Sequence, residues 1–599
     1  MSFDINQLDY SLVVPVFMLL GLIFFTWLLD LMLPRRHKAA IGWVAIAGLV
    51  VCVATAVPLW GVRANFAGVL RIDEFSVFFS VLFLLTAIGI MLISMDYADR
   101  FLPQPGEYFG LVLCGTLGMI LMASANELLT AYISLELLSF SSYVLVSYAK
   151  TNLKSNEAGM KYIILGAFSS ALLLYGISLL YGALGTTYFP DIASSVAGPD
   201  GASPAFGVGL ALIMAGLGFK VAAVPFHMWT PDVYEGAPTP ITAYLSVASK
   251  AAGFALVLRF LIGGLLPLRD QYQAVFALLA VLTMTLGNLV AIQQRNVKRL
   301  LAYSSIAQAG YVLVGLAAIT PDLDIAEQAT RGMMLHLAGY AFTNLAAFGA
   351  FIAFQNLNNG REMIGDLAGL ARRAPFVGLA MMAALFSLAG MPLFAGFVTK
   401  FYLFAAAARA ELLWLVAIAV INSTISLYYY LLVVYQLYVR TPVGFETAEG
   451  NGHGQAAMAE SQAPALAMAR ATPVAPVAPV AAAGGGAVTV QQGGAAQHVG
   501  DLRRDGYGGH GANGHPPNDH GSPEGHGGHG GGAGGPETPW WQRRITGEMP
   551  PEHTYPQYRI PFALTAGLLL FLVGVFYIGL WPRDLIELLQ GASQALFAG

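Results

Sequence analysis

Long apolar segments of roughly 20 residues recur along most of the chain, and they constrain its fold more than any other feature. Each segment is long enough to cross the ~30 Å hydrocarbon core of a bilayer as an α-helix. The composition agrees, since 56% of the 599 residues are hydrophobic, only 11% are charged, and the mean hydropathy is +0.64. A soluble domain carries about 25% charged residues. We therefore predict an all-α polytopic membrane protein.

The apolar segments divide into about fourteen predicted spans. Many contain glycine, as expected of helices that pack closely in a membrane. The predicted spans are 12–33, 40–60, 73–95, 107–125, 127–149, 158–184, 205–229, 239–266, 272–293, 299–319, 331–355, 375–408, 411–439 and 558–581.

Lysine and arginine in the short loops predict the orientation. The loops after odd-numbered spans carry 13 Lys and Arg residues, and the loops after even-numbered spans carry 5. Because positive charge is retained on the cytoplasmic side, we predict that the odd-span loops are cytoplasmic. Both termini are then periplasmic.

Residues 441–557 differ from the rest of the chain, because they are rich in Gly, Ala, Pro and His and poor in large aliphatic residues. Such a segment cannot bury enough apolar area to offset its ordering entropy. Eight of the 11 histidines lie between His453 and His553, and His-rich tracts can bind metals. Irregular spacing without cysteine argues against a defined site, so we predict a disordered cytoplasmic loop and no metal site. The five histidines of this loop that would be the candidate metal ligands are His510, His515, His520, His526 and His529.

Ionisable side chains inside the predicted spans are the first candidates for function, because a charge there costs about 2.5–3.5 kcal/mol on insertion scales. They are Glu136, Lys220, His227, Lys250, Arg259, His336 and Lys400. A buried Lys loses and regains a proton more readily than Arg does. Three lysines in separate spans with one Glu therefore indicate a proton relay, with Glu136 expected beside Lys220. An inert buried pair, or lysines that extend to the membrane surface, is the simpler alternative.

The histidines give weaker indications, because a buried His is often a hydrogen-bonded core residue. His227 follows Lys220 by seven positions, which is two helical turns, so we expect the two side chains to share a helix face.

Two of the lysines lie next to helix-breaking residues. Pro225 removes a backbone N–H close to Lys220, and the stretch with Gly390, Pro392 and Gly396 precedes Lys400. Broken spans in corresponding halves of a transporter indicate an ion site between inverted repeats. Since the broken spans are the seventh and the twelfth, we predict two five-helix repeats, spans 4–8 and 9–13.

The segment VPFHMWTPDVYEGAPTPITAYLSVASKAAGFA resembles the signature of the antiporter-like membrane subunits of respiratory complex I, the NADH:quinone oxidoreductase. SLELLSFSSYVLVSY and NEAGMKYIILGAFSSALLLYGISLLYGALGTT are most similar to the N-type subunit. The resemblance covers nearly all of residues 70–440 and the last span. It implies fourteen helices, inverted repeats and a half-channel in each repeat.

The resemblance also implies the site. The essential carboxylate falls on Glu136, and the lysines of spans seven, eight and twelve fall on Lys220, Lys250 and Lys400. Lys161 matches a further lysine of the N type. His227, His336 and Arg259 are secondary members of the predicted path.

The family implies regions at 1–106 (first three helices), 107–266 (first repeat), 267–440 (second repeat), 441–557 (loop) and 558–599 (last helix and tail). The insert 441–557 departs from the family pattern. The implied partners are the M, L, K, J and A types of complex I membrane subunit and the lipid bilayer of a bacterial cytoplasmic membrane, with no nucleic acid.

The same resemblance implies a non-redox subunit of the oxidoreductase. The chain has no CxxC cluster ligands and no dinucleotide fingerprint, so quinone, FMN and iron–sulfur clusters are expected on other subunits, and no cofactor here. Two alternatives stay open. One is a subunit of a multi-subunit sodium/proton antiporter, and the other is a passive scaffold whose His-rich loop binds metal or a partner.

Overall fold

The computed structural model describes residues 8–34, 37–198, 203–440 and 560–598. Within these ranges the chain is almost entirely helical, which confirms the predicted fold class. One short antiparallel hairpin, β1 (Ala64–Phe66) with β2 (Leu70–Ile72), was not indicated by the sequence patterns. The described helices belong to one compact unit. The histidines of the His-rich segment lie outside the described residues.

The helices before the middle of the chain follow the predicted spans closely. They are α1 (Val14–Met32), α2 (Ala39–Ala56), α3 (Glu74–Phe101), α4 (Pro105–Ser124), α5 (Leu128–Val146), α6 (Leu153–Leu184), α7 (Phe189–Val196), α8 (Pro204–Val221), α9 (Trp229–Gly236), α10 (Thr239–Tyr244), the π-turn η5 (Leu245–Ser249) and α11 (Lys250–Gly264).

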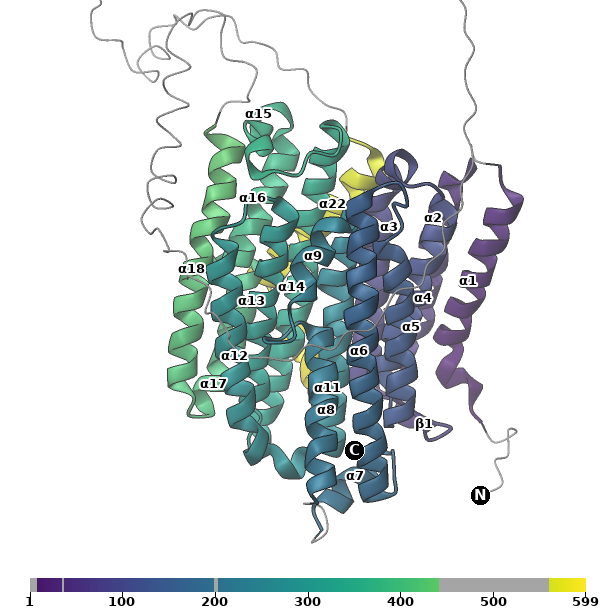
Figure 1. Ribbon diagram of the computed structural model, residues 1–599, viewed down its shortest axis with the longest axis vertical. Coiled ribbons are helices and arrows are strands. Elements are labelled where there is room, and N and C mark those ends of the chain that lie inside the picture. The colour runs from purple at the N-terminus through teal and green to yellow at the C-terminus, as the bar shows by residue number, and fades with distance from the viewer. Residues whose placement is uncertain (1–7, 35–36, 199–202, 441–559, 599) are drawn as a thin grey trace, which may run out of the picture. The chain divides into compact units, whose positions relative to one another are not determined.

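The remaining helices are α12 (Arg269–Ala291), α13 (Val297–Ala317), α14 (Leu323–Leu357), α15 (Leu370–Arg373), α16 (Pro375–Ala389), α17 (Ala395–Arg409), α18 (Leu413–Tyr438), α22 (Phe562–Leu580) and α23 (Arg583–Phe597). Single-turn helices precede or join them at Tyr10–Val13, Val57–Leu59, Leu266–Leu268 and Ile364–Leu367. Figure 1 shows α7 and β1 at one end of the bundle and α15 at the other.

Thirteen helical segments of the described residues are long and apolar enough to cross a membrane. They correspond to thirteen of the predicted spans. The remaining prediction, 375–408, is present as two shorter helices, α16 and α17, because the chain is interrupted between them.

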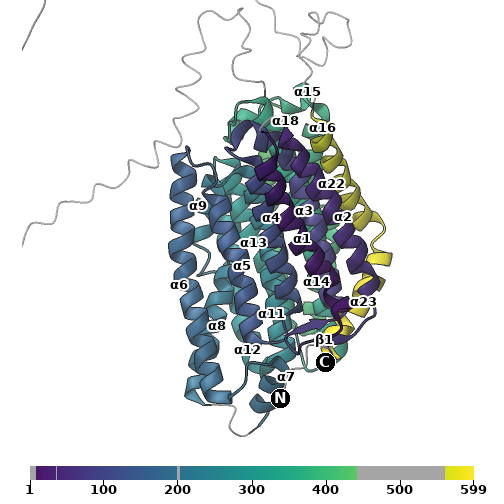
Figure 2. The ribbon, with the colours of Figure 1, turned by 90° about the vertical axis from the view of Figure 1, so that its right-hand side faces the viewer.

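The most enclosed helices form the centre of the bundle. The segment from α10 to α11 is entirely buried over its most apolar stretch, and α13 and α14 are nearly so. Helices α1, α6, α12 and α18 instead present large apolar side chains outward, for example Leu31 and Phe168. An outward apolar surface of this kind suits a lipid environment. On another side, α22 and α23 pack against α3 and α14 (Figure 2).

Both predicted broken spans are interrupted. Helix α8 ends at Val221 and Ala222 has a left-handed φ of 60°, while α16 ends at Ala389 and Gly390 has φ of 86°. In Figure 1, α8 and α17 lie toward the end with α7, and α9 and α16 lie toward the end with α15. The chain therefore passes the two interruptions in opposite directions. That agrees with inverted repeats, although the symmetry of spans 4–8 and 9–13 stays a prediction.

Close packing explains one glycine of the second break. A Cβ on Gly396 would collide with the backbone oxygen of Ser387, so only glycine lets the start of α17 lie against the end of α16. The Gly396 N–H donates to Ser387 Oγ at 3.0 Å. The two half-helices are thus fixed to each other beside Lys400.

Candidate functional site

Lys220 lies in the last turn of α8, directly before the first break. Its side chain is 4% exposed, and Nζ donates to Ser139 Oγ of α5 at 3.1 Å. The stem of Lys220 crosses α11 at Gly253, where an added Cβ would lie 3.4 Å from Lys220 Cγ. Because Gly253 is three residues after Lys250, the α8 lysine contacts the helix of the second lysine one turn away.

The first break satisfies its freed backbone groups through neighbouring side chains. The Val224 N–H donates to Thr283 Oγ1 at 3.0 Å, and the indole N–H of Trp229 donates to the Phe219 carbonyl at 3.0 Å. Within a bilayer, irregular backbone is stable only where protein groups replace these hydrogen bonds. The side chains of neighbouring helices therefore stabilise the break.

One prediction about this break is wrong. Helix α8 ends at Val221, before Pro225, and His227 lies in the non-helical connection to α9. The seven-residue spacing therefore does not place His227 on the same helix face as Lys220. The helical period applied there assumes a continuous helix, which Ala222 ends.

Glu136 lies on α5 and is half-buried. Its Oε1 accepts a hydrogen bond from Ser170 Oγ of α6 at 2.5 Å. Among the described residues no ion pair joins Glu136 to Lys220, and serines accept or donate the direct hydrogen bonds of both groups. Ser139, which accepts from Lys220, follows Glu136 by three positions and occupies the next turn on the same side of α5. The carboxylate and the ammonium are neighbours separated by a serine.

Lys250 begins α11, directly after the π-turn η5. It is 3% exposed, and Nζ donates to Ser305 Oγ of α13 at 2.7 Å. The ring of Tyr234 lies 5.8 Å from Nζ. A π-turn changes the helical register and is frequent at functional sites. Here it ends at the lysine.

A small cavity lies beside Lys250, lined by residues of α11, α13 and α14. Its volume is about 10 Å³, and its polar lining includes Lys250, Ser305, Gln308 and His336. That is close to the least space that accommodates one water molecule. His336 is buried, and its Nε2 has no hydrogen-bond partner among the described residues. A polar lining with an unpartnered nitrogen suits a single water.

His336 connects this cavity to α17. Its Nδ1 lies 3.1 Å from Thr399 Oγ1, and Thr399 directly precedes Lys400. The predicted secondary role of His336 thus has a geometric basis, because the residue lines the cavity and its Nδ1 contacts α17.

Lys400 lies opposite the second break and is 4% exposed. Its Nζ donates to the Leu388 carbonyl at 2.9 Å and to Ser423 Oγ at 3.0 Å, with the Tyr311 ring 4.7 Å away. The Leu388 carbonyl also accepts from Gln308 Nε2 at 3.1 Å. This carbonyl is available because α16 ends at the next residue, which leaves its last carbonyls without helical partners.

Lys161 does not join the buried lysines. Its side chain is 44% exposed and forms ion pairs with Glu157 at 2.7 Å and Asp232 at 2.9 Å. Lys154, Glu235 and Arg299 complete this surface group around a recess of about 140 Å³. Burial opposes ionisation of Asp232, but hydrogen bonds from Lys161 and Arg299 hold its pKa below the ordinary value. Ser170, which donates to Glu136, lies nine residues further along α6, so Lys161 is about 13 Å of helix away from that end of the site.

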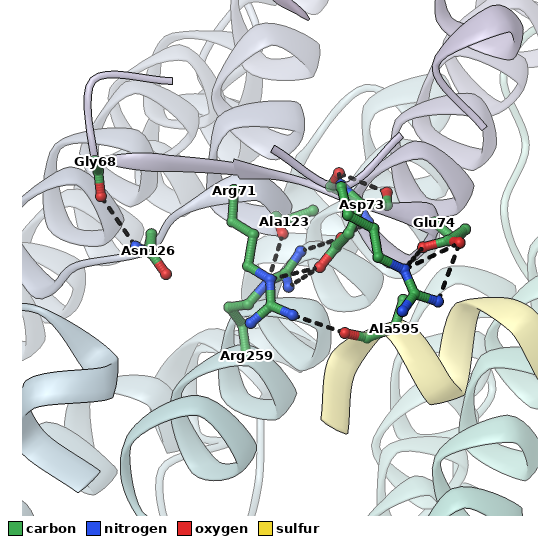
Figure 3. Close-up of polar contacts among 10 residues, drawn as sticks. Gly68, Arg71, Asp73, Glu74, Ala123, Asn126, Arg259 and Ala595 are labelled. Atoms are coloured by element: carbon green, nitrogen blue, oxygen red, sulfur yellow. Dashed lines mark hydrogen bonds and ion pairs between the residues drawn. The ribbon is translucent and has the colours of Figure 1, made fainter. Parts of the chain in front are cut away.

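Arg259 also lies away from the lysines, about 13 Å along α11 from Lys250. Its guanidinium binds the Asp73 carboxylate through two bonds of 2.6 and 2.7 Å, and Nε donates to the Ala123 carbonyl at 3.1 Å (Figure 3). Arg71 contributes a third contact to Asp73 at 3.0 Å and donates to the Ala595 carbonyl of α23 at 2.8 Å. This group ties α11, α3 and α23 together. The place of Arg259 on the proton path stays a prediction, and its contacts indicate a structural role.

Several contributors to the site escaped the sequence analysis. Ser139, Ser305, Gln308, Thr399 and Tyr311 each contact a lysine or His336, or line the cavity. Polar residues at facing positions of apolar spans are a usable signal for the first four. The Leu388 carbonyl carries no signal in its side chain. Lys298 is a further buried lysine, paired with Glu362 at 2.6 Å.

The part of the chain that the structure describes holds no group of three His, Cys, Asp or Glu residues placed to bind a metal ion. Cys52 and Cys114 are both free.

A helical membrane bundle with two interrupted spans, and ammonium groups buried beside both, defines a membrane subunit of the antiporter type. Residues 125–426 match the model of the family described as NADH:quinone oxidoreductase/Mrp antiporter, TM, and the chain belongs to this family. It is 46% identical over 414 residues to NADH-quinone oxidoreductase subunit N of Moorella thermoacetica, which covers 69% of this chain and 85% of that protein. The resemblance drawn from the motifs is thereby confirmed.

Solved structures agree. A chain of respiratory complex I from Thermus thermophilus, determined with bound aureothin, has a TM-score of 0.60 and 33% identity, covering 76% of this chain and 96% of that chain. A chain of the Mrp complex from Dietzia sp. DQ12-45-1b has a TM-score of 0.72 at 20% identity, covering 98% of each chain. The second similarity concerns the fold alone.

Proposed function

We propose that this chain moves protons across a bacterial cytoplasmic membrane as the N-type subunit of an NADH:quinone oxidoreductase of the complex I type. The observation that supports this most is the row formed by Lys220, Lys250 and Lys400. Each ammonium is buried and held by neutral oxygens. A buried ammonium without a contacting carboxylate is costly, so its protonation depends strongly on charges nearby. That sensitivity is what a proton carrier requires.

The first half of the path contains Glu136 and Lys220. Because Ser139 and Ser170 take the direct hydrogen bonds, the carboxylate acts on Lys220 through space. An interaction of this kind is strong in a low-dielectric interior and has no contact ion pair to break. A change of charge near Glu136 then alters the protonation of Lys220, and the proton passes toward Lys250 on the adjoining α11.

The second half runs through the cavity. A proton leaving Lys250 Nζ crosses one water to reach His336 Nε2, and His336 releases the proton on Nδ1 toward Thr399 Oγ1, beside Lys400. The imidazole accepts at one nitrogen and donates from the other, so its net charge is restored after each transfer.

The wider assignments follow the same family. We place the odd-span loops and residues 441–557 in the cytoplasm and both termini in the periplasm. The partners are the other membrane subunits of the complex, of the M, L, K, J and A types. Quinone reduction, FMN and iron–sulfur chemistry belong to other subunits, and this chain contributes translocation without a redox step. The regions 107–266 and 267–440 are the two repeats, supported by the repeated close pairs α4 with α5 and α12 with α13.

Inverted membrane vesicles that contain the assembled complex test the proposal. Proton uptake and quinone reduction are measured together in Lys220→Ala, Lys250→Ala and Lys400→Ala, with the surface variant Lys154→Ala as the control. We expect loss of proton uptake in the three buried variants and little change in the control. Normal uptake per quinone in all three would exclude the buried lysines as carriers.

The fold similarity to the Mrp complex chain favours one second candidate, a subunit of a multi-subunit sodium/proton antiporter. The vesicles discriminate between the two. An antiporter subunit would support sodium-driven proton movement without an electron donor, whereas a complex I subunit would require electron transfer to quinone.

A further inference from the structure

The Lys400 ammonium rests on an aromatic ring. Nζ lies 4.7 Å from the centre of the Tyr311 ring, and the tyrosine is fully buried. Among the described residues no carboxylate forms an ion pair with Lys400. A cation over the face of a buried aromatic ring is stabilised by the ring quadrupole. Tyr311 therefore supplies electrostatic stabilisation that a neutral hydrogen-bond acceptor alone does not.

Asn288 fixes the position of this ring. Its Nδ2 donates to Tyr311 Oη at 3.2 Å and to Asn422 Oδ1 at 3.3 Å, and its Oδ1 accepts from Tyr429 Oη at 3.0 Å. Both amide hydrogens are used and the oxygen has a donor, so the amide has one favourable orientation. Asn422 in turn donates to Thr285 Oγ1 at 3.2 Å. The network joins α12, α13 and α18.

The backbone allows this contact because two helices approach closely at glycines next to the pair. A Cβ on Gly287 would lie 2.7 Å from the backbone nitrogen of Ala307, and one on Gly310 would lie 2.6 Å from that of Met284. Gly287 precedes Asn288, and Gly310 precedes Tyr311. The close approach of α12 and α13 thus brings the amide to the phenol.

We propose that Asn288 is a positioning residue that holds the Tyr311 ring under Lys400, so that the charged lysine is stabilised without a carboxylate. The inference deepens the proposed function and depends on the role of Lys400 in it. On this proposal, the face of the Tyr311 ring stabilises the charged form of Lys400. The Tyr311 hydroxyl acts as an anchor and is not a carrier of the proton.

Ring and hydroxyl are separated by three variants in the assembled complex, with proton uptake per quinone reduced as the readout and complex content measured on native gels. Tyr311→Phe keeps the ring and loses the anchor, so we expect a loss of about threefold. Tyr311→Leu loses both, and we expect a loss of about tenfold. Equal losses in these two variants would overturn the role of the ring. Tyr428→Leu, an outward-facing tyrosine of α18, is the matched control.

The role of Asn288 is tested by combination. Asn288→Leu alone should lose about threefold. Asn288→Leu with Tyr311→Phe should lose no more than Asn288→Leu alone, because both substitutions remove the same hydrogen bond from Asn288 Nδ2 to Tyr311 Oη. Multiplied losses in the double variant would overturn the positioning role. A role in folding alone would lower the complex content and leave uptake per quinone unchanged, which would also overturn it. Lys400→Ala is measured separately: normal uptake there would refute the role of Lys400 in the proposed function, whatever the Tyr311 and Asn288 variants show.

Discussion

Lys400 and Gln308 donate hydrogen bonds to the same oxygen, the backbone carbonyl of Leu388, at 2.9 and 3.1 Å. The Gln308 side chain lines the cavity beside Lys250 and also contacts the carbonyl that accepts a hydrogen bond from Lys400. Gln308 therefore links the surroundings of the two lysines.

Gln308→Leu should decrease proton uptake by about tenfold while the complex still assembles. The leucine preserves most of the volume but places apolar atoms at the cavity, where a water can no longer find polar partners. The measurement is uptake per quinone reduced in vesicles. Gln328→Leu, on the surface of α14 where Gln328 bonds Arg409, is the control, and an equal decrease there would contradict the specific role of Gln308.

Ser139→Ala should decrease proton uptake by about tenfold, because it leaves the buried Lys220 ammonium without its hydrogen-bond acceptor. Ser142→Ala is the matched control on α5, since Ser142 Oγ donates only to the Leu138 carbonyl of its own helix among the described contacts. If both variants pump like the parent, the contact from Lys220 to Ser139 is not part of the path.

Asp73→Asn should destabilise the protein by about 3–5 kcal/mol, because it leaves the buried Arg259 guanidinium without its counter-charge. The measurement is thermal unfolding in detergent, followed by tryptophan fluorescence. Glu74→Gln is the control: its partner Arg63 is 51% exposed, and an exposed ion pair contributes only about 0–1 kcal/mol. Similar melting temperatures for the two variants would contradict the assignment.

The same pair predicts a pH dependence. Burial opposes ionisation of Asp73, yet Arg259, the Ser76 N–H and Arg71 hold its pKa below the ordinary value of 3.8. A lowered carboxyl pKa contributes stability that is complete above pH 3.8 and is lost as the pH falls through the native pKa. The difference in melting temperature between the parent and Asp73→Asn should thus be constant from about pH 8 to 5 and shrink below about pH 4. A difference that instead widened on acidification would contradict this sign.

Gly396→Ala should lower stability by about 3 kcal/mol, since its methyl group would collide with the Ser387 carbonyl and separate α16 from α17. The quantity of assembled complex and its melting temperature report the effect. Gly207→Ala, on α8 with no atom near its added Cβ, should be neutral or slightly stabilising. An unaffected Gly396→Ala complex would show that the second break tolerates a wider helix separation.

Sequence patterns predict most of this fold, because in lipid every backbone group must be satisfied within a helix and apolar length then locates each span. They also place Lys220, Lys250 and Lys400 beside or between the two breaks. They do not predict where those side chains point. The opposite charges of Glu136 and Lys220 predict that the two lie beside each other, but not which atoms meet: serines on α5 and α6 take the hydrogen bonds. Nor do they predict the partner of Arg259, because the fold brings Asp73 to it from a segment 186 residues earlier.

The carbonyl that Lys400 and Gln308 share has a consequence for how variation in this chain is read. Leu388 accepts these two hydrogen bonds with its backbone oxygen, which every amino acid carries, while its side chain packs in the core. Apolar substitutions of similar volume at position 388 will therefore look tolerated in a mutational survey, because they keep both the packing and the carbonyl. A mutational scan reports only the effect of changing side chains, so it would classify Leu388 as an ordinary core residue. Replacing the amide on its C-terminal side by an ester, which weakens the carbonyl as an acceptor, is the kind of chemistry that reveals it.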